Sequence, residues 1–147
     1  MSRRPRTGSG EMAVERAGGR SITPHTMTED YLQYHFSPGF EAGGFLFVSG
    51  QIGLHPSGLA PSDPSEQARI AFERLGAVLA EAQLSYDDIV SITSHHVGDV
   101  AGIFDWFPAV KDVFLAPPYP AWTAIGVSGL AIPELVIEIS AIARSSA

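Results

Sequence analysis

The stretch LVIEISAI at residues 135–142 has the strongest β-strand character in the sequence. Within it, Glu138 lies between two isoleucines whose side chains should point to the opposite side of the strand. Residues 122–127 before it also have β character, and the run PPYP at residues 117–120 separates them from the preceding element. The C-terminal part of the chain is therefore predicted to form two strands.

A further strand and a helix are predicted upstream of this pair. Residues 89–97 (IVSITSHHV) alternate apolar and polar side chains, as a strand requires. After them, apolar residues recur at spacings of four, three and four, which predicts an amphipathic helix: Ile103, Phe107, Val110 and Phe114. Pro108 falls near the first turn of this helix, where proline is tolerated best.

A longer helix has clear start signals. Asp63 can cap its N-terminus, Pro64 takes the first helical position and Glu66 the third. Apolar residues then recur at helical spacing as far as about residue 83. They form one face that is predicted to lie on a sheet: Ala68, Ala71, Phe72, Leu75, Val78, Leu79 and Ala82.

Aromatic and β-branched residues precede this helix. Residues 34–40 (YHFSPGF) and 45–53 (FLFVSGQIG) are predicted to form a hairpin with a tight connection at residues 41–44. The predicted order is then β-β-α-β-α-β-β. Two helices over one face of a single sheet place the chain in the α+β class.

Composition favours one globular domain. The chain has 147 residues, of which 45% are hydrophobic, and no run approaches the roughly 18 apolar residues of a membrane span. The lack of cysteine excludes disulfides, thiolate catalysis and Cys-ligated metal sites. We expect a soluble, cytoplasmic protein with no membrane partner.

Charge is distributed unevenly along the chain. Five of the nine basic residues lie within the first 20 positions, whereas residues 21–147 hold four basic residues against fourteen acids. Residues 1–28 lack apolar periodicity and are predicted to be a flexible basic extension before a single domain at residues 29–147. This acidic domain would repel a phosphate backbone, so we expect no nucleic-acid partner.

Four segments together resemble the YjgF/Rid (reactive intermediate deaminase) family, also called endoribonuclease L-PSP: residues 45–53, the helix start with QAR at residues 67–69, YPAWTAIGVSGL at residues 119–130, and VIEISAIA at residues 136–143. The resemblance implies a chorismate-mutase-like fold and a homotrimer whose sheets form a central barrel, with a pocket at each subunit interface. It also implies a small-molecule substrate, an imine or enamine hydrolysed to a keto acid and ammonia, without metal or other cofactor.

One position departs from the family pattern. After Pro-Ala, members carry an arginine that pairs with the substrate carboxylate, whereas this chain has Trp122. Tryptophan offers one N–H donor and no charge, so we do not expect deamination of small imines such as 2-aminoacrylate. Trp122 either stacks on a larger or aromatic ligand or fills the vacated space as core.

Glu138 matches the family glutamate that positions the attacking water and is the catalytic candidate. The alternative is an ordinary exposed strand glutamate. Phe36 and Phe107 stand where members often carry a tyrosine and an asparagine, which predicts an apolar pocket, although each also suits a core. The resemblance adds a Ser-Gly-Gln turn and two residues beside Trp122 to this pocket: Ser49, Gly50, Gln51, Tyr119 and Ala124.

The adjacent pair His95 and His96 should point to opposite faces of its strand, so the two cannot ligate one metal ion. One of them is a candidate acid or base at the cleft, and the alternative is a surface or core histidine. Three functions stay open: an imine or enamine hydrolase, a non-catalytic ligand-binding or regulatory trimer, and a ribonuclease. The acidity of the domain argues against the third.

Overall fold

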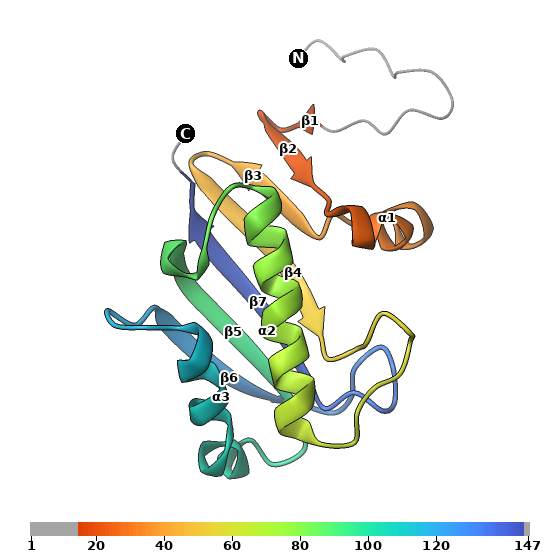
Figure 1. Ribbon diagram of the computed structural model, residues 1–147, viewed down its shortest axis with the longest axis vertical. Helices are drawn as coiled ribbons and strands as arrows, with labels where there is room; N and C mark the ends of the chain where they lie inside the picture. Colours follow the sequence, from red (N-terminus) through yellow and green to blue (C-terminus); the bar gives the residue numbers. More distant parts are fainter. Residues whose placement is uncertain (1–14, 146–147) are drawn as a thin grey trace.

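The computed structural model describes residues 15–145, which form one seven-stranded sheet (Figure 1). The order across the sheet is β1-β2-β3-β4-β7-β5-β6. The pair β5–β6 is parallel, and the other neighbours are antiparallel. The strands are β1 (Glu15–Arg16), β2 (Gly19–Ile22), β3 (Gly39–Ala42), β4 (Phe45–Ile52), β5 (Ile89–Val97), β6 (Ala121–Val127) and β7 (Ile137–Arg144).

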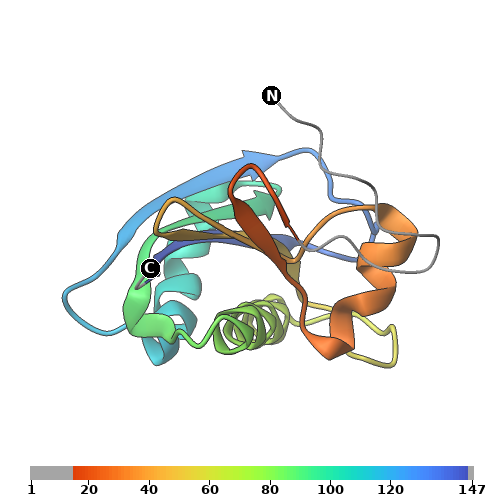
Figure 2. The same ribbon diagram turned by 90° about the horizontal axis from the view of Figure 1, so that it is seen from above.

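Helices α2 (Pro64–Glu81) and α3 (Phe107–Phe114) both lie on the same face of the sheet (Figure 2). A third helix, α1 (Thr28–Tyr34), precedes β3, and three short 3-10 helices complete the described chain: η1 (His25–Met27), η2 (Tyr86–Asp88) and η3 (Val100–Asp105). From β3 to β7 the elements follow the predicted order β-β-α-β-α-β-β. The predicted α+β class is confirmed.

The predicted start of α2 is found in the structure. The Ser65 N–H donates to Asp63 Oδ1 at 3.0 Å, and Pro64 occupies the first turn, where its missing N–H costs nothing. The buried face of α2 rests on β4 and β7. Phe72 and Leu75 are fully buried there. Each buried side chain of this size contributes about 1.5–3 kcal/mol.

Gln67 in α2 is a buried polar residue that fixes the approach to β7. Its Nε2 donates to the carbonyl oxygens of Pro61 (2.9 Å) and Glu134 (3.0 Å), and its Oε1 accepts from the Val136 N–H (2.9 Å). One side chain thereby ties the loop before α2 to the segment that leads into β7. These bonds hold the start of the strand that carries Glu138.

The N-terminal part differs from the prediction in two places. Residues 34–40 were predicted as a strand, but Thr28–Tyr34 form α1, His35 ends it in the left-handed conformation (φ 58°), and β3 begins at Gly39. No residue of α1 is buried, so its sequence has no apolar stripe that could have predicted a helix. The strand prediction for residues 34–38 is therefore wrong.

The second difference concerns the predicted extension of residues 1–28. Residues 1–14 lie outside the described range. From Glu15 the chain forms β1 and β2, and β2 pairs with β3 in register Ser21↔Phe40. Ile22 and Met27 are buried in the core. The sheet thus starts well before the boundary predicted at residue 28.

The predicted second helix is divided. Trp106 has φ −140° and ψ −36°, which ends η3 and starts α3. Pro108 lies in the first turn of α3, and a residue that has no N–H suits the start of a new helix better than the interior of a longer one. The break turns Phe104 outward while Phe107 stays in the core.

The other face of the sheet has no helix over it in the described chain (Figure 2). Leu46 and Val48 of β4 are buried beneath α2, so the alternating Phe45 and Phe47 point to the open face, where they are 36% and 48% exposed. Ile125 of β6 is 41% exposed on the same face. Apolar residues therefore line a sheet surface that a single subunit leaves uncovered.

Candidate functional site

The predicted site residues divide between the two faces of the sheet. Ile137 and Ile139 are fully buried on the helix side of β7, so Glu138 between them points to the open face. Trp122 in β6 points to the helix side, where its ring lies 5.6 Å from that of Phe107. Within one subunit, Glu138 and Trp122 are thus separated by the sheet itself.

Gly50 makes room for the carboxyl group of Glu138. The register of β4 against β7 shifts between Val48 and Gln51, which inserts an extra residue and forms a bulge at this point. A Cβ at position 50 would lie 1.8 Å from Glu138 Oε1 and 2.5 Å from its Cδ. The predicted Ser-Gly-Gln turn is therefore a strand bulge, and its glycine leaves the space that the Glu138 carboxyl group occupies.

The other two residues of this motif serve the local backbone. Ser49 Oγ donates to the Ser37 carbonyl oxygen at 2.6 Å, and the Ser49 N–H donates to the Pro38 carbonyl oxygen. Gln51 is buried, and its Nε2 donates to the Ser49 carbonyl oxygen at 3.1 Å. Ser49 thus ties the bulge to the segment before β3, and Gln51 braces the bulge from within.

His95 lies beside Glu138 on the open face. The two residues are direct partners across β5 and β7, and His95 Nδ1 is 3.3 Å from the Glu138 carbonyl oxygen. The Glu138 carboxylate is partly buried and has no hydrogen-bond partner in the part of the chain that the structure describes. A carboxylate, an imidazole and a glycine bulge thus meet at one place, with free acceptor capacity for a water molecule.

A buried polar chain links Trp122 to His96 on the helix side. The Trp122 Nε1–H donates to Ser94 Oγ at 2.9 Å, and Ser94 Oγ is 2.8 Å from His96 Nε2. Because the indole N–H is used internally, Trp122 presents a ring and no polar donor to a ligand. Ser94 fixes the orientation of that ring.

His96 is held neutral. It is 2% exposed, and Phe107 meets its ring edge-on at 5.0 Å. Desolvation by burial, with a smaller contribution from neighbouring His95, lowers the pKa of His96 to about 4. As predicted, the two histidines point to opposite faces, and His96 is the core histidine of the pair.

Four other predicted pocket residues are placed differently from one another. Phe107 is fully buried and is core in this subunit, whereas Phe36 lies in the loop before β3 and is 41% exposed. Ala124 is partly buried near Trp122, and Tyr119 is 60% exposed in the loop before β6. The structure therefore places Ala124 on the same face of β6 as Trp122 and the Tyr119 ring near the same ammonium group, that of Lys111, and leaves Phe36 apart from them.

Sequence reasoning missed Lys111 and Phe104. Lys111 Nζ lies 5.3 Å from the ring centroids of both Tyr119 and Trp122, and the Phe104 ring lies 5.6 Å from that of Trp122. Helical spacing carried the signal, because Lys111 follows Phe107 by four positions and shares its face of α3. No pattern in the sequence indicated Phe104, because the direction of its side chain depends on the break between η3 and α3 at Trp106.

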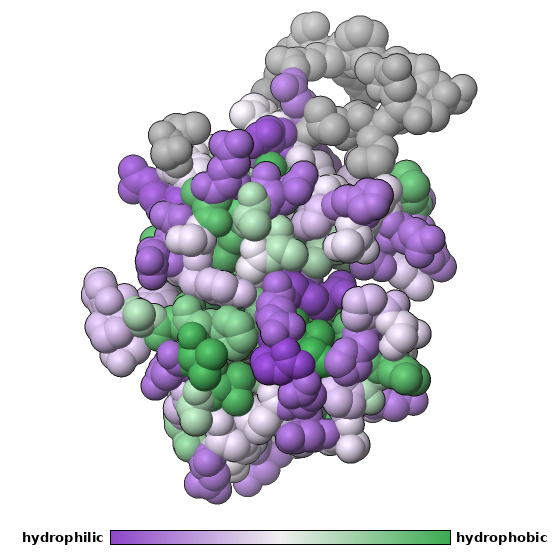
Figure 3. All heavy atoms as spheres, viewed as in Figure 1, coloured by the Kyte–Doolittle hydropathy of each residue, from purple (hydrophilic) through white to green (hydrophobic). Residues whose placement is uncertain are grey.

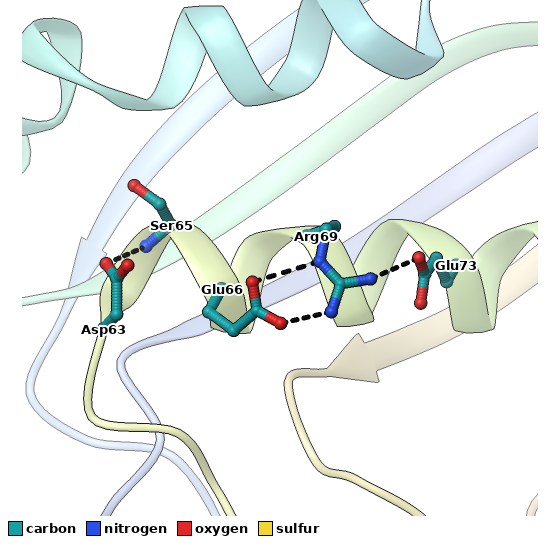
Figure 4. A network of polar contacts seen from close by, with 5 residues as sticks. All are labelled: Asp63, Ser65, Glu66, Arg69 and Glu73. Atoms are coloured by element: carbon teal, nitrogen blue, oxygen red, sulfur yellow. Dashed lines mark hydrogen bonds and ion pairs between the residues drawn. The ribbon is translucent and has the colours of Figure 1, made fainter.

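The arginine of the QAR motif does not reach this region. Arg69 on α2 is bound by two glutamates of its own helix: Nε donates to Glu66 Oε2 at 3.0 Å, and the terminal nitrogens bond to Glu66 and Glu73 (Figure 4). It therefore does not replace the carboxylate-binding arginine that position 122 lacks.

In residues 15–145 no group of three or more His, Cys, Asp or Glu side chains is arranged to hold a metal ion. No helix of this described range is long and apolar enough to cross a membrane.

Comparisons with known proteins agree on a family. The Endoribonuclease L-PSP family model matches residues 28–145. The RutC family protein YjgH of Escherichia coli strain K12 is 40% identical over 114 residues, which cover 78% of this chain and 86% of YjgH. The E. coli K12 protein named "Putative reactive intermediate deaminase TdcF" is 34% identical over 112 residues, covering 74% of this chain and 85% of TdcF.

Solved structures give the same result. Protein YJGH matches with a TM-score of 0.77 and 38% identity over 88% of this chain and 98% of its own. RidA from an Antarctic Psychrobacter species matches with a TM-score of 0.69 and 28% identity, over 74% of this chain and 87% of its own. With a matching family model and these sequence relatives, the chain belongs to the endoribonuclease L-PSP family, that is, the YjgF/Rid family.

Proposed function

We propose that the protein hydrolyses an imine, or an enamine after its tautomerisation to the imine, in a pocket remodelled for an apolar or aromatic substrate. Water adds to the C=N carbon, the C–N bond of the resulting carbinolamine breaks, and a carbonyl compound and ammonia leave. The relative named as a reactive intermediate deaminase supports this class of reaction. The observation that carries the proposal is the free Glu138 carboxylate seated against Gly50.

We assign to Glu138 the role of holding and deprotonating the attacking water. Its carboxylate can accept a hydrogen bond from the attacking water and take a proton as the C–O bond forms. His95 is assigned a supporting role, because its imidazole is adjacent across the strand pair and can return a proton to the departing nitrogen. We assign to Trp122 the binding of the apolar part of the substrate, because its ring can contact a ligand whereas its N–H is already bonded to Ser94.

A homotrimer completes this proposal. Glu138 and Trp122 lie on opposite faces of one sheet, so a pocket that holds both needs residues from a second copy. The open face carries three partly exposed apolar side chains, Phe45, Phe47 and Ile125, which a subunit interface would cover. Light scattering should give about three times the subunit mass of 15.6 kDa. A single-subunit mass at micromolar concentration would contradict the trimer.

The test of the reaction uses imino acids generated in place from amino acids by an amino-acid oxidase, with carbonyl formation followed over time. Aromatic imino acids should be turned over faster than the spontaneous rate, and 2-aminoacrylate should not. Glu138→Gln keeps the shape and removes the base, so its rate should fall by about a hundredfold to ten-thousandfold. Ser140→Ala, a change on the same face of β7, is the matched control. Unchanged turnover in Glu138→Gln would refute the assignment.

A ligand-binding trimer without catalysis is the second candidate. It is favoured by the burial of Phe107 and by the internal hydrogen bond of Trp122, which together fill the helix side of β6. Binding of an aromatic ligand with no turnover of any imine would support it. A ribonuclease is disfavoured because the net charge is −7 and Arg20, Arg69 and Arg74 are all paired with acids.

A further inference from the structure

The surface beside α3 carries an unusual grouping, which we call the aromatic patch: Tyr119 and Trp122 at the ammonium group of Lys111, and Phe104 against the Trp122 ring. Phe104 and Tyr119 are 58% and 60% exposed, and Trp122 is partly buried. Separately from these rings, aliphatic and other strongly hydrophobic residues gather over α3 on the face seen in Figure 3. Large exposed rings grouped at one place on a soluble protein mark a binding surface more often than chance.

Lys111 is held at this patch by aromatic rings. Its side chain is only 11% exposed, and Nζ lies 5.3 Å from the ring centroids of both Tyr119 and Trp122. An ammonium group has three N–H donors. One of them meets Asp112 Oδ1 at 2.9 Å, and the other two have no hydrogen-bond acceptor among the described residues. The cation is therefore fixed in position with unused donors.

The pairing with Asp112 leaves Lys111 available to a ligand. Asp112 is the next residue along the helix and is 51% exposed, and it takes up only one of the three ammonium donors. A carboxylate entering between the rings would be less hydrated than Asp112 and could take up the free donors. The acidity of the chain and the nearby Asp112 favour an anion with a single charge over a phosphate.

We propose that the aromatic patch and Lys111 form a binding site for an aromatic carboxylate, with the ligand ring against Trp122 and its carboxylate on Lys111 Nζ. Ser94 is a positioning residue for this site, because its Oγ accepts the Trp122 indole N–H and fixes the ring plane. The claim that the patch binds part of the substrate rests on the proposed imine hydrolysis. The claim that the patch binds an aromatic carboxylate does not depend on that reaction.

Three small probes separate the contributions of ring and charge: phenylacetate, the isosteric neutral phenylacetamide, and acetate. Binding is followed by NMR through the Trp122 indole N–H signal, assigned with Trp106→Phe. Phenylacetate should bind about tenfold or more tightly than phenylacetamide, because a charge-assisted hydrogen bond is lost in the amide. Acetate should bind weakly. Equal affinities for phenylacetate and phenylacetamide would overturn the proposal without any variant.

Two variants then assign the charge to Lys111. Lys111→Met keeps the aliphatic chain and should lower phenylacetate affinity to that of phenylacetamide, whereas Lys111→Arg should keep most of it. Unchanged phenylacetate affinity in Lys111→Met, with an unchanged mass by light scattering, would overturn the proposal. If the mass of Lys111→Met changes, Lys111→Arg, which keeps the charge, decides instead: an affinity of that variant for phenylacetate no higher than for phenylacetamide would overturn the proposal.

Turnover of imines and binding of phenylacetate test the two proposals separately. Glu138→Gln should lower turnover by about a hundredfold to ten-thousandfold but keep the preference for phenylacetate over phenylacetamide, because that preference is assigned to the Lys111 ammonium group. If no imine is turned over but phenylacetate still binds through Lys111, the anion site stands and the hydrolase fails. If imines are hydrolysed and Lys111→Met binds phenylacetate normally, the hydrolase stands and the anion site fails.

Discussion

The carboxylate of Glu138 occupies the space in which any side chain at position 50 would begin: Oε1 lies 1.8 Å from the Cβ that residue 50 would carry. The strand bulge at Gly50 and the glutamate on β7 are thus one structural unit. Whatever Glu138 does, its position depends on the absence of a methyl group on the neighbouring strand.

Gly50→Ala is therefore expected to displace Glu138 while the fold survives. The clash is with the flexible end of a side chain, and the φ of Gly50 does not lie in the left-handed region, so Ala fits the backbone. Unfolding free energy should change by less than about 1 kcal/mol. Turnover of an aromatic imine should fall by about tenfold or more, since a misplaced base loses most of its effect.

The double variant Gly50→Ala with Glu138→Gln provides the control. If the methyl group acts by moving Glu138, the double variant should be no slower than Glu138→Gln alone. If the double variant lost activity by the product of the two single losses, Gly50 would act independently of Glu138, for example through the bulge itself. Gly43→Ala is unsuitable as a control because its φ is 62°, whereas Gly102→Ala meets no atom within 4 Å.

Phe107 and Phe36 should differ sharply in their effect on stability. Phe107 is fully buried and stacks near Phe72 (6.1 Å between ring centroids), so Phe107→Ala should cost about 3–5 kcal/mol. Phe36 is 41% exposed, and Phe36→Ala should cost less than about 1 kcal/mol. Urea unfolding measures both. Equal costs would contradict the placement of Phe107 in the core.

Much of the fold could be predicted from local patterns in the sequence. The start of α2 was set by Asp63 and Pro64, and the period of two in β7 placed Glu138 opposite the isoleucines. The N-terminal strands were missed because β2 depends on pairing with β3, which no local pattern encodes. Helix α1 was missed because it buries none of its residues.

The site was harder to predict because it depends on which residues are brought together. The motif that holds Trp122 and the one that holds Glu138 suggested a single pocket, yet strand parity sends their side chains to opposite faces. The bulge at Gly50 appears only in the register of β4 against β7. Helical spacing from Phe107 placed Lys111 on the buried face of α3. Its contact with the Tyr119 ring could not be predicted, because Tyr119 lies in the separate loop before β6.

Phe47→Asp tests the open face as an interface. Phe47 is 48% exposed in one subunit, and an unpaired carboxylate buried there by a second subunit would be strongly unfavourable. The variant should elute and scatter light as a single subunit, with its far-ultraviolet circular dichroism retained. Val113→Asp, at a 77% exposed position on α3, is the control and should keep the mass of the wild type. Identical masses for both variants would place the interface elsewhere.

The pH dependence of stability should report on His96. Burial lowers its pKa to about 4 in the folded protein, against 6.5 in the unfolded chain. Between these values the unfolded chain binds a proton that the folded one does not, so stability is full above pH 6.5 and is lost as the pH falls towards 4. The loss contributed by this group can reach about 1.4 kcal/mol per pH unit.

The measurement is urea unfolding at several pH values from 7 to 4.5. His96→Gln should be less stable at pH 7, because it disturbs the bond to Ser94, but its stability should fall less steeply with decreasing pH. His25→Gln removes an exposed histidine and should keep the slope of the wild type. If the slope is the same in His96→Gln as in the wild type, then His96 takes up its proton equally in both states, and the neutral chain from Trp122 through Ser94 to His96 does not exist in solution.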